Sequence, residues 1–157
     1  MPPADIDGAH AVDAAADDLL LLQLVRVVNL AGRPFAQRVG REHRLTLPEW
    51  RVMAVVARLP GCTASQVCEQ CGMDKMAVSR ALGSLQRAQR VDRCADPDDQ
   101  RCNRLYLSEA GRALHAVVRE AARHREAELF EGMVPAEREQ LAAALEKMLA
   151  AMARVDH

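Results

Sequence analysis

Apolar residues recur at helical spacing along most of the chain, which predicts a largely helical protein. The first helical pattern starts at Asp17 or Asp18, because an aspartate there can cap a helix, and it continues through Leu30. Pro34 lacks the backbone donor that a helix interior uses, so we expect a kink or a restart at that point. The helical pattern then resumes as far as Glu42.

Three shorter helices are predicted in the middle of the chain, and each has its own start signal. Thr46 can cap the first of them. Thr63 followed by Gln66 is the pattern of a capping box and starts the second. Asp74 can cap the third, and residues 71–74 are the only connection between the last two. Two short helices joined by so short a turn predict a helix-turn-helix.

The segment after the helix-turn-helix predicts a β-hairpin, with two long helices behind it. Residues 91–93 and 104–107 form two short strand-like stretches around the polar, turn-forming residues 95–100. A hairpin in this position is a wing. Ser108 can cap the first long helix, and Val134-Pro135 restarts the chain for the second. The apolar stripe predicted for the first of these helices consists of Leu114, Val117, Val118 and Ala121.

This order predicts a mainly α fold with a small β-wing. Residues 45–107 form a winged helix-turn-helix domain, and long N- and C-terminal dimerisation helices flank it at residues 17–44 and 108–157. We expect residues 1–16 to form a flexible acidic arm and residues 17–157 to form a single domain. The outer helices carry more apolar surface than one small domain needs, which favours a homodimer.

Composition and charge narrow the classes of protein. Aromatic residues make up 3% of the chain and apolar residues 50%, so the core must be aliphatic. No apolar run approaches the roughly 20 residues of a membrane span, and the N-terminus lacks the basic start of a secretory signal. We therefore expect a cytoplasmic protein with no membrane partner. The net charge of −1 hides a basic segment at residues 75–104, which favours an anionic partner.

Four motifs in the right order and spacing resemble one known family. Residues 45–53 (LTLPEWRVM) and 73–82 (MDKMAVSRAL) resemble the family's segment before the helix-turn-helix and the start of its recognition helix. Residues 91–101, with their Asp-x-Arg, resemble its wing, and residues 107–111 (LSEAG) resemble the segment after the wing. Over about residues 20–150 the chain resembles the MarR family of bacterial regulators. The resemblance implies a homodimer on pseudo-palindromic operator DNA, with repression released by a small molecule or by thiol oxidation.

The helix that starts after Asp74 supports DNA binding independently of the resemblance. A helix with a short polar N-terminus can enter the major groove, so we expect Lys75 and Ser79 to reach base edges. The start of the preceding helix can contact phosphates through side chains and free amides. In the wing we expect Arg101, oriented by Asp99, to enter the minor groove. The predicted DNA-binding residues are Thr63, Ser65, Gln66, Lys75, Met76, Ala77, Ser79, Arg80, Arg93, Asp99 and Arg101.

A small-molecule effector is the second partner that the resemblance implies, in a site between the dimer helices and the DNA-binding lobe. Within the matching segments, Arg33 or Arg38 can pair with a carboxylate, and His43 can bind a phenol or a ring nitrogen. Trp50 can line the wall of such a site, although ordinary core packing explains it equally well. We therefore predict an aromatic or phenolic acid, by analogy with the family.

Five cysteines offer the alternative of a thiol-redox-responsive regulator or a thiol redox protein. Cys68 and Cys71 have Cys-x-x-Cys spacing, but their positions fall on the apolar stripe of a short helix, which favours packing. Cys94 and Cys102 are nearly opposite across the predicted wing, so a disulfide there is conceivable. Cys62 should be the most exposed of the five. No cysteine precedes it, unlike the pattern of the family's organic-peroxide sensors.

Metal binding and catalysis find little support in the sequence. The histidines are scattered, and no His-x3-His or Cys-His pair stands out, so we expect no metal and no cofactor. No nucleophile, base and orienting residue can be grouped with any specificity, so the chain is predicted not to be an enzyme. A winged-helix module that serves only protein contacts is a third hypothesis. The presence of Ser79, Arg80 and Arg101 argues against it.

Overall fold

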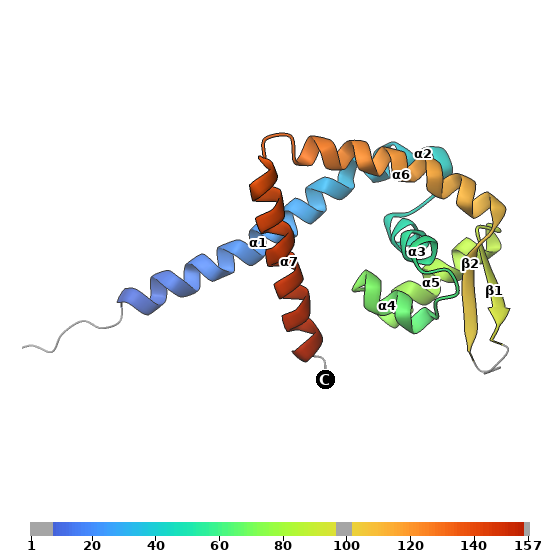
Figure 1. Cartoon of the computed structure of the whole chain (residues 1–157), viewed down its shortest axis with the longest axis horizontal. Coiled ribbons are helices and arrows are strands. Elements are labelled where there is room, and N and C mark those ends of the chain that lie inside the picture. Colours follow the sequence, from blue (N-terminus) through green and yellow to red (C-terminus); the bar gives the residue numbers. More distant parts are fainter. Residues whose placement is uncertain (1–7, 97–101, 156–157) are drawn as a thin grey trace, which may run out of the picture. The chain divides into compact units, whose positions relative to one another are not determined.

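The computed structural model describes residues 8–96 and 102–155, and the chain divides into two compact units, Met1–Glu120 and Ala121–His157. The boundary falls within a helix that the sequence assigned to one continuous domain, so each unit is described by itself. Helices dominate, and the two strands form one antiparallel hairpin, which confirms the predicted fold class (Figure 1). The elements are α1 (Gly8–Gln37), α2 (Val39–His43), α3 (Leu47–Arg58), α4 (Ala64–Cys71), α5 (Lys75–Arg87), β1 (Val91–Ala95), β2 (Asn103–Leu107), α6 (Glu109–Leu129) and α7 (Pro135–Val155).

Helix α1 begins earlier than the sequence pattern predicted. It starts at Gly8, so Asp17 and Asp18 lie inside the helix and do not cap it. The upstream residues are rich in alanine, the residue that favours a helix most, and this propensity extends the helix without an apolar stripe. Pro34 also stays within α1, and the break comes at Arg38, whose backbone N–H donates to the Pro34 carbonyl (3.0 Å).

The three middle helices begin at the predicted caps. The Thr46 hydroxyl accepts from the backbone N–H of Glu49 (3.3 Å), and the Glu49 carboxylate accepts from the backbone N–H of Thr46 (2.7 Å). Thr63 and Gln66 form the same reciprocal pair at the start of α4. The Asp74 carboxylate caps α5. Each helix of the helix-turn-helix is therefore fixed by local side-chain chemistry that the sequence displays directly.

The wing is an antiparallel hairpin, as predicted. Val91 at the start of β1 pairs with Leu107 at the end of β2. On its other edge β2 meets the segment before α4, because Leu105 donates to the Cys62 carbonyl (2.9 Å) and accepts from Gly61 (2.8 Å). The hairpin is thus bonded to the turn that leads into the helix-turn-helix.

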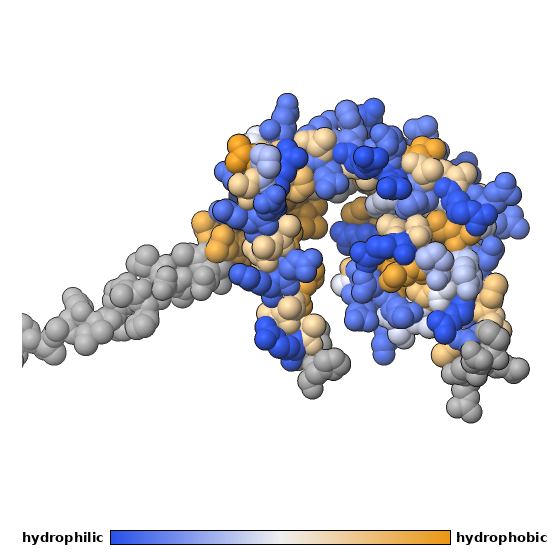
Figure 2. All heavy atoms as spheres, viewed as in Figure 1, coloured by the Kyte–Doolittle hydropathy of each residue, from blue (hydrophilic) through white to orange (hydrophobic). Residues whose placement is uncertain are grey.

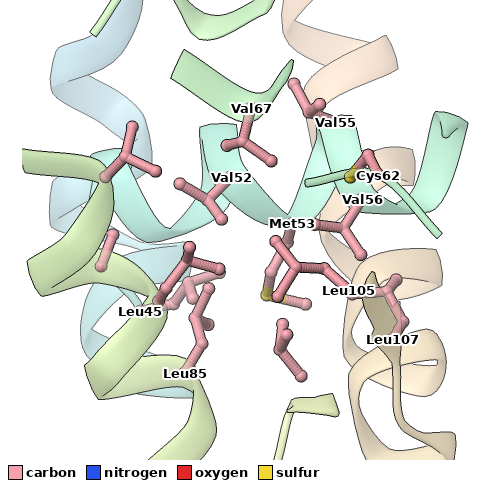
Figure 3. Packing of buried hydrophobic residues seen from close by; sticks show 14 of the residues in the cluster. Leu45, Val52, Met53, Val55, Val56, Cys62, Val67, Leu85, Leu105 and Leu107 are labelled. Atoms are coloured by element: carbon pink, nitrogen blue, oxygen red, sulfur yellow. The ribbon is translucent and has the colours of Figure 1, made fainter. Parts of the chain in front are cut away.

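Aliphatic side chains from α3, α4, α5, β1, β2 and α6 form one buried cluster, in keeping with the scarcity of aromatic residues. Met53 of α3, Leu85 of α5 and Leu105 of β2 are all members of this cluster (Figure 3). The buried members are Leu45, Val52, Met53, Val55, Val56, Cys62, Val67, Val78, Ala81, Leu82, Leu85, Val91, Leu105, Leu107 and Val118.

The start of α6 is locked against the start of β1. A Cβ atom at Gly111 would lie 1.9 Å from the carbonyl oxygen of Arg90, so only glycine fits there. Ser108 donates its backbone N–H to the same carbonyl (3.1 Å) and caps α6 by accepting from the N–H of Gly111 (3.0 Å). The Arg90 guanidinium donates to the carbonyls of His43 (2.6 Å) and Arg44 (3.1 Å). One residue thus joins the wing, α6 and the end of α2.

The inward face of α6 within the first unit differs from the predicted stripe. Leu114 and Val118 face the core as expected, but Val117 is 55% exposed. Ala121, the last member of the predicted stripe, is the first residue of the second unit and is exposed. The face that packs inward is instead Gly111, Leu114, His115 and Val118. These positions have the spacing of one helix face, but Gly111 and His115 are not apolar residues, so a pattern of apolar positions does not include them.

The outer helices expose apolar side chains. Leu19, Leu20, Leu21 and Leu22 of α1 are all more than half exposed, and apolar surface is visible on this helix (Figure 2). In the second unit, α7 exposes Leu145, Met148, Leu149 and Met152. Among the helices that the structure describes, none is long and apolar enough to cross a membrane.

Candidate nucleic-acid interface

Helix α5 combines an anchored face with an exposed polar start. Val78, Leu82 and Leu85 on its inner face are buried in the core. The predicted DNA-binding residues of this helix lie outside this buried face, and only Ala77 among them is half-buried. The exposed ones are Lys75, Met76, Ser79 and Arg80.

A surface hollow brings together predicted DNA-binding residues from three elements. Ser65 comes from α4, Lys75 and Ser79 from α5, and Arg93 from β1. The floor is apolar and includes Cys68. The sequence therefore predicted four residues that the fold places around a single concave surface. The full lining is Ala64, Ser65, Cys68, Lys75, Val78, Ser79, Leu82 and Arg93.

At the start of α4 the side chains divide into two groups. The hydroxyl of Thr63 and the amide oxygen of Gln66 are engaged in the capping box (3.3 and 2.9 Å). Ser65 lies between them, is exposed and lines the hollow. The first backbone amides of a helix have no acceptor inside it, so an anion at this end would meet donors from the backbone.

Directly after β1, the buried carboxylate of Asp96 forms an ion pair with the partly exposed side chain of Arg104. Asp96 is 5% exposed, and Nε of Arg104 donates to its Oδ2 at 2.6 Å. Nη1 of Arg104 donates to the Gly61 carbonyl at 3.2 Å. The hydrogen bond that Arg104 donates to Asp96, together with the negative charge of Asp96, raises the pKa of Arg104, so this guanidinium stays charged. The two other predicted wing residues, Asp99 and Arg101, lie outside the residues that the structure describes.

The four predicted effector residues are not brought to one place by the contacts that the structure gives. Arg33 and Arg38 are exposed, and the His43 imidazole is half-buried, 3.9 Å from the carboxylate of Glu42. Trp50 is half-buried. None of the four lines the hollow beside α5.

Trp50 instead belongs to an aromatic stack that sequence reasoning did not assemble. Its ring lies 6.2 Å from the ring of Phe35 on α1 and 5.3 Å from the imidazole of His115 on α6, with small interplanar angles. Burial, and then the charge of Arg119, lower the pKa of His115, so its neutral form stacks on Trp50 near neutral pH. No local spacing links residues so far apart in the chain, although the inward face of α6 would have placed His115 inside.

Two of the cysteines, Cys62 and Cys71, lie in surroundings that disfavour a reactive thiolate. Cys62 is 4% exposed, so the prediction that it is the most exposed cysteine is wrong. The reason is its pairing with Leu105 of β2, a tertiary contact. Burial raises the pKa of the Cys62 thiol, and burial also outweighs the positive charge of Arg51 and raises that of Cys71. A raised pKa disfavours the nucleophilic thiolate.

Cys94 and Cys102 are diagonal across the wing and not directly opposite. Cys94 pairs with Arg104, and the backbone N–H of Asp96 donates to the Cys102 carbonyl. Diagonal residues in an antiparallel pair are about 7–8 Å apart, whereas a disulfide brings Cβ atoms to about 3.8 Å. In addition, no group of three or more His, Cys, Asp or Glu residues that could hold a metal occurs in the described part of the chain.

The comparisons with known proteins agree with this geometry. The family model of the MarR family matches residues 44–101, which include α3, α4, α5 and β1. No curated relative matches the sequence.

Solved structures are similar to this chain beyond residues 44–101. A MarR-family transcriptional regulator from Silicibacter pomeroyi is 28% identical, with a TM-score of 0.74 over 82% of this chain and 86% of that one. Bordetella bronchiseptica BpsR, whose DNA binding is regulated by 6-hydroxynicotinic acid, is 24% identical (TM-score 0.73, 83% and 98% covered). Streptomyces coelicolor PcaV, solved with its natural ligand, is 18% identical (TM-score 0.72, 97% and 99% covered). The chain thus shares its fold with transcriptional regulators.

Proposed function

We propose that this chain is a DNA-binding transcriptional regulator that reads its operator with the start of α5. The observation that carries the proposal is the hollow on which Ser65, Lys75, Ser79 and Arg93 converge within the MarR-family region. In this arrangement α5 enters the major groove and Lys75 and Ser79 reach base edges. Ser65 and the first amides of α4 bind phosphate, while Thr63 and Gln66 hold the helix start in place.

The wing adds contacts beside the groove that α5 enters. Arg93 on β1 is exposed and lies at the rim of the hollow, where it can neutralise a backbone phosphate. The Asp-x-Arg pattern of the sequence supports Arg101 as the residue that enters the minor groove, with Asp99 orienting it. Arg101→Ala should therefore weaken operator binding while leaving the dimer intact.

The active form is a homodimer built through the outer helices. Apolar side chains of α1 and α7 are exposed in the single chain, and such large apolar surfaces mark association sites. A two-fold dimer presents two α5 helices, which matches a pseudo-palindromic operator with half-sites about one helical turn apart.

Operator binding represses transcription and is released by a small aromatic or phenolic acid. The similar folds of BpsR and PcaV, one regulated by 6-hydroxynicotinic acid and one solved with its natural ligand, support an effector of this kind. In this chain the stacked rings of Phe35, Trp50 and His115 offer aromatic surface for such a molecule. Arg33, Arg38 and His43 remain the residues we propose for its carboxylate and hydroxyl. Titration of the protein–DNA complex with hydroxybenzoate isomers tests this: at least one should release the DNA.

The proposed DNA binding is tested by fluorescence anisotropy with a labelled duplex taken from beside the coding gene, at two salt concentrations. Wild-type protein should bind tightly, with an affinity that falls as salt rises and with preference over a scrambled duplex. Lys75→Ala should weaken binding about tenfold or more. Lys147→Ala removes the same charge from α7 and should leave the affinity unchanged. Absence of binding at low salt, or an equal effect of both variants, would contradict the proposal.

A further inference from the structure

Two acidic side chains are buried in the described part of the chain, and only one of them has a purely local explanation. Glu49 is 8% exposed and closes the capping box at the start of α3. Asp96 is 5% exposed and caps no helix. It stands directly after β1, and its carboxylate accepts from Nε of Arg104 in the middle of β2. Burying a carboxylate is costly, so a buried, paired aspartate at this point of the wing calls for a reason.

The Arg104 side chain reaches beyond the wing. Its Nη1 donates to the carbonyl of Gly61, in the turn that leads to the N-cap of α4 at Thr63. The same turn is bonded to β2 through the backbone of Leu105. The ion pair therefore joins three segments: the end of β1, the middle of β2 and the approach to α4.

We propose that Asp96 and Arg104 are positioning residues for DNA binding, which hold the wing strand with Arg93 in register with the N-terminus of α4. This inference rests on the proposed function. A duplex meets both elements at once, so any freedom of the wing relative to α4 would have to be lost on binding. The ion pair removes that freedom during folding, so Arg93 and the N-terminus of α4 are already in position when the DNA binds.

A positioning role and simple charge predict effects of opposite sign. An acidic residue near a phosphate backbone repels it, so removing the carboxylate should strengthen DNA binding if only charge matters. If the carboxylate positions the wing, its removal should weaken binding even though the protein becomes more positive. Asp92, which is exposed on β1 four residues earlier, provides a control with the same change of charge.

The experiment compares DNA affinity by anisotropy for the full-length wild type, Asp96→Ala, Asp96→Asn and Asp92→Ala. We expect Asp96→Ala to bind about tenfold more weakly, which is the scale of one lost DNA contact. Asp96→Asn keeps an acceptor for Arg104 and should lose less. Asp92→Ala should bind as tightly as wild type or slightly more tightly. The plot of log affinity against log salt has a negative slope, and its magnitude should decrease by about one for Asp96→Ala, because the phosphate contact of Arg93 is lost.

A double-mutant cycle separates the pair from the charge of Arg104 itself. Arg104→Gln should weaken binding in the wild-type background and do so several-fold less when Asp96 is already alanine. Stoichiometric titration gives the active fraction, so that a loss of folded protein is distinguished from a change in Kd. If Asp96→Ala does not fold, Asp96→Asn and the cycle built on it decide the question.

The outcomes are distinguishable. If wild-type protein binds no duplex at low salt, the proposed function fails, and this inference with it. If wild type binds and both Asp96 variants bind as tightly or more tightly, the proposed function stands and the positioning role is overturned. A lower active fraction with unchanged Kd, or effects of Asp96 and Arg104 that simply add, would also overturn it.

Discussion

The winged-helix region and the outer helices are built from the same aliphatic residues but use them differently. Side chains of the region between Leu45 and Leu107 form a cluster in which Met53, Leu82, Leu85 and Leu105 are almost inaccessible. In α1 and α7, leucines and methionines of the same kind stand exposed. The middle of the chain therefore buries its apolar side chains by itself, whereas the outer helices need a second surface.

The two regions also differ in how their helices begin. The middle helices are short, and α3, α4 and α5 are each capped by a side chain that fixes where they start. Helix α1 is 30 residues long and begins in an alanine-rich stretch. Short helices need caps and packing to be stable, whereas a long helix gains more from propensity and association. Side-chain caps therefore fix the starts of α4 and α5, the two helices that carry the proposed interface.

Truncating a buried methionine in the winged-helix region should change the stability of the protein more than any other substitution proposed below. Met53 is fully buried, so Met53→Ala should lower the free energy of unfolding by about 3 kcal/mol through lost burial and a residual cavity. Met76→Ala makes the same chemical change at a residue that is 66% exposed and should change it by less than about 0.5 kcal/mol. Urea denaturation measures both. Similar losses for the two variants would contradict the assignment of the core.

The next prediction concerns the exposed apolar side chains of the outer helices. Leu149 of α7 is 70% exposed in the single chain, and Leu149→Glu should weaken the proposed dimer at least tenfold by placing a charge in an apolar contact. The far-UV circular dichroism of the variant should stay close to that of wild type, because the winged-helix region remains folded. Sedimentation velocity over a concentration series follows the change in mass. A variant that stays as dimeric as wild type would show that α7 is not the dimer surface.

A smaller effect separates stability from binding within α4. Thr63→Ala removes the cap and should cost about 1 kcal/mol of stability. Ser65→Ala keeps the capping box and should leave the melting temperature nearly unchanged while weakening DNA binding. Thermal melts and anisotropy on the same samples test both statements. A Ser65 variant that melts early and binds normally would reverse the roles assigned to these two residues.

The smallest effect concerns pH and the histidine behind Trp50. Burial lowers the pKa of His115 in the folded state, so the unfolded chain takes up the proton first. The contribution of His115 to stability is therefore complete above its ordinary pKa of about 6.5 and is lost as the pH falls below that value. His115→Gln should flatten this part of the stability profile, measured by urea denaturation between pH 7.5 and 5.

His124 is an exposed histidine farther along α6 and serves as the control. His124→Gln should leave the slope of the wild-type profile unchanged. If His115→Gln keeps the full slope, the stacked imidazole is not the group that titrates.

The sequence predicted well the features that depend on neighbours in the chain. The starts of α4 and α5 could be predicted from Thr63, Gln66 and Asp74, because a helix cap depends only on residues within about four positions of one another. The gathering of Lys75, Ser79 and Arg93 came from recognising the helix-turn-helix and the wing. The local sequence pattern was therefore enough to predict most of the fold and much of the proposed DNA interface.

Contacts between distant segments escaped that reasoning. Cys62 was placed on the surface because it sits in a loop, but its pairing with Leu105 buries it. His115 of α6 meets Trp50 of α3, a contact without local spacing. Asp96 lies in the polar turn predicted for residues 95–100, and no local pattern shows that its carboxylate is buried against Arg104. Each depends on tertiary packing that no periodicity expresses.

If the winged-helix region reads DNA while the outer helices join two chains, a footprint with a measured stoichiometry tests both roles at once. Hydroxyl-radical footprinting of wild-type protein on the duplex from beside its gene should protect two symmetric half-sites about one helical turn apart. Sedimentation of the same complex should give two chains per duplex. A single protected half-site with one chain bound, or no protection at low salt, would contradict this division of roles.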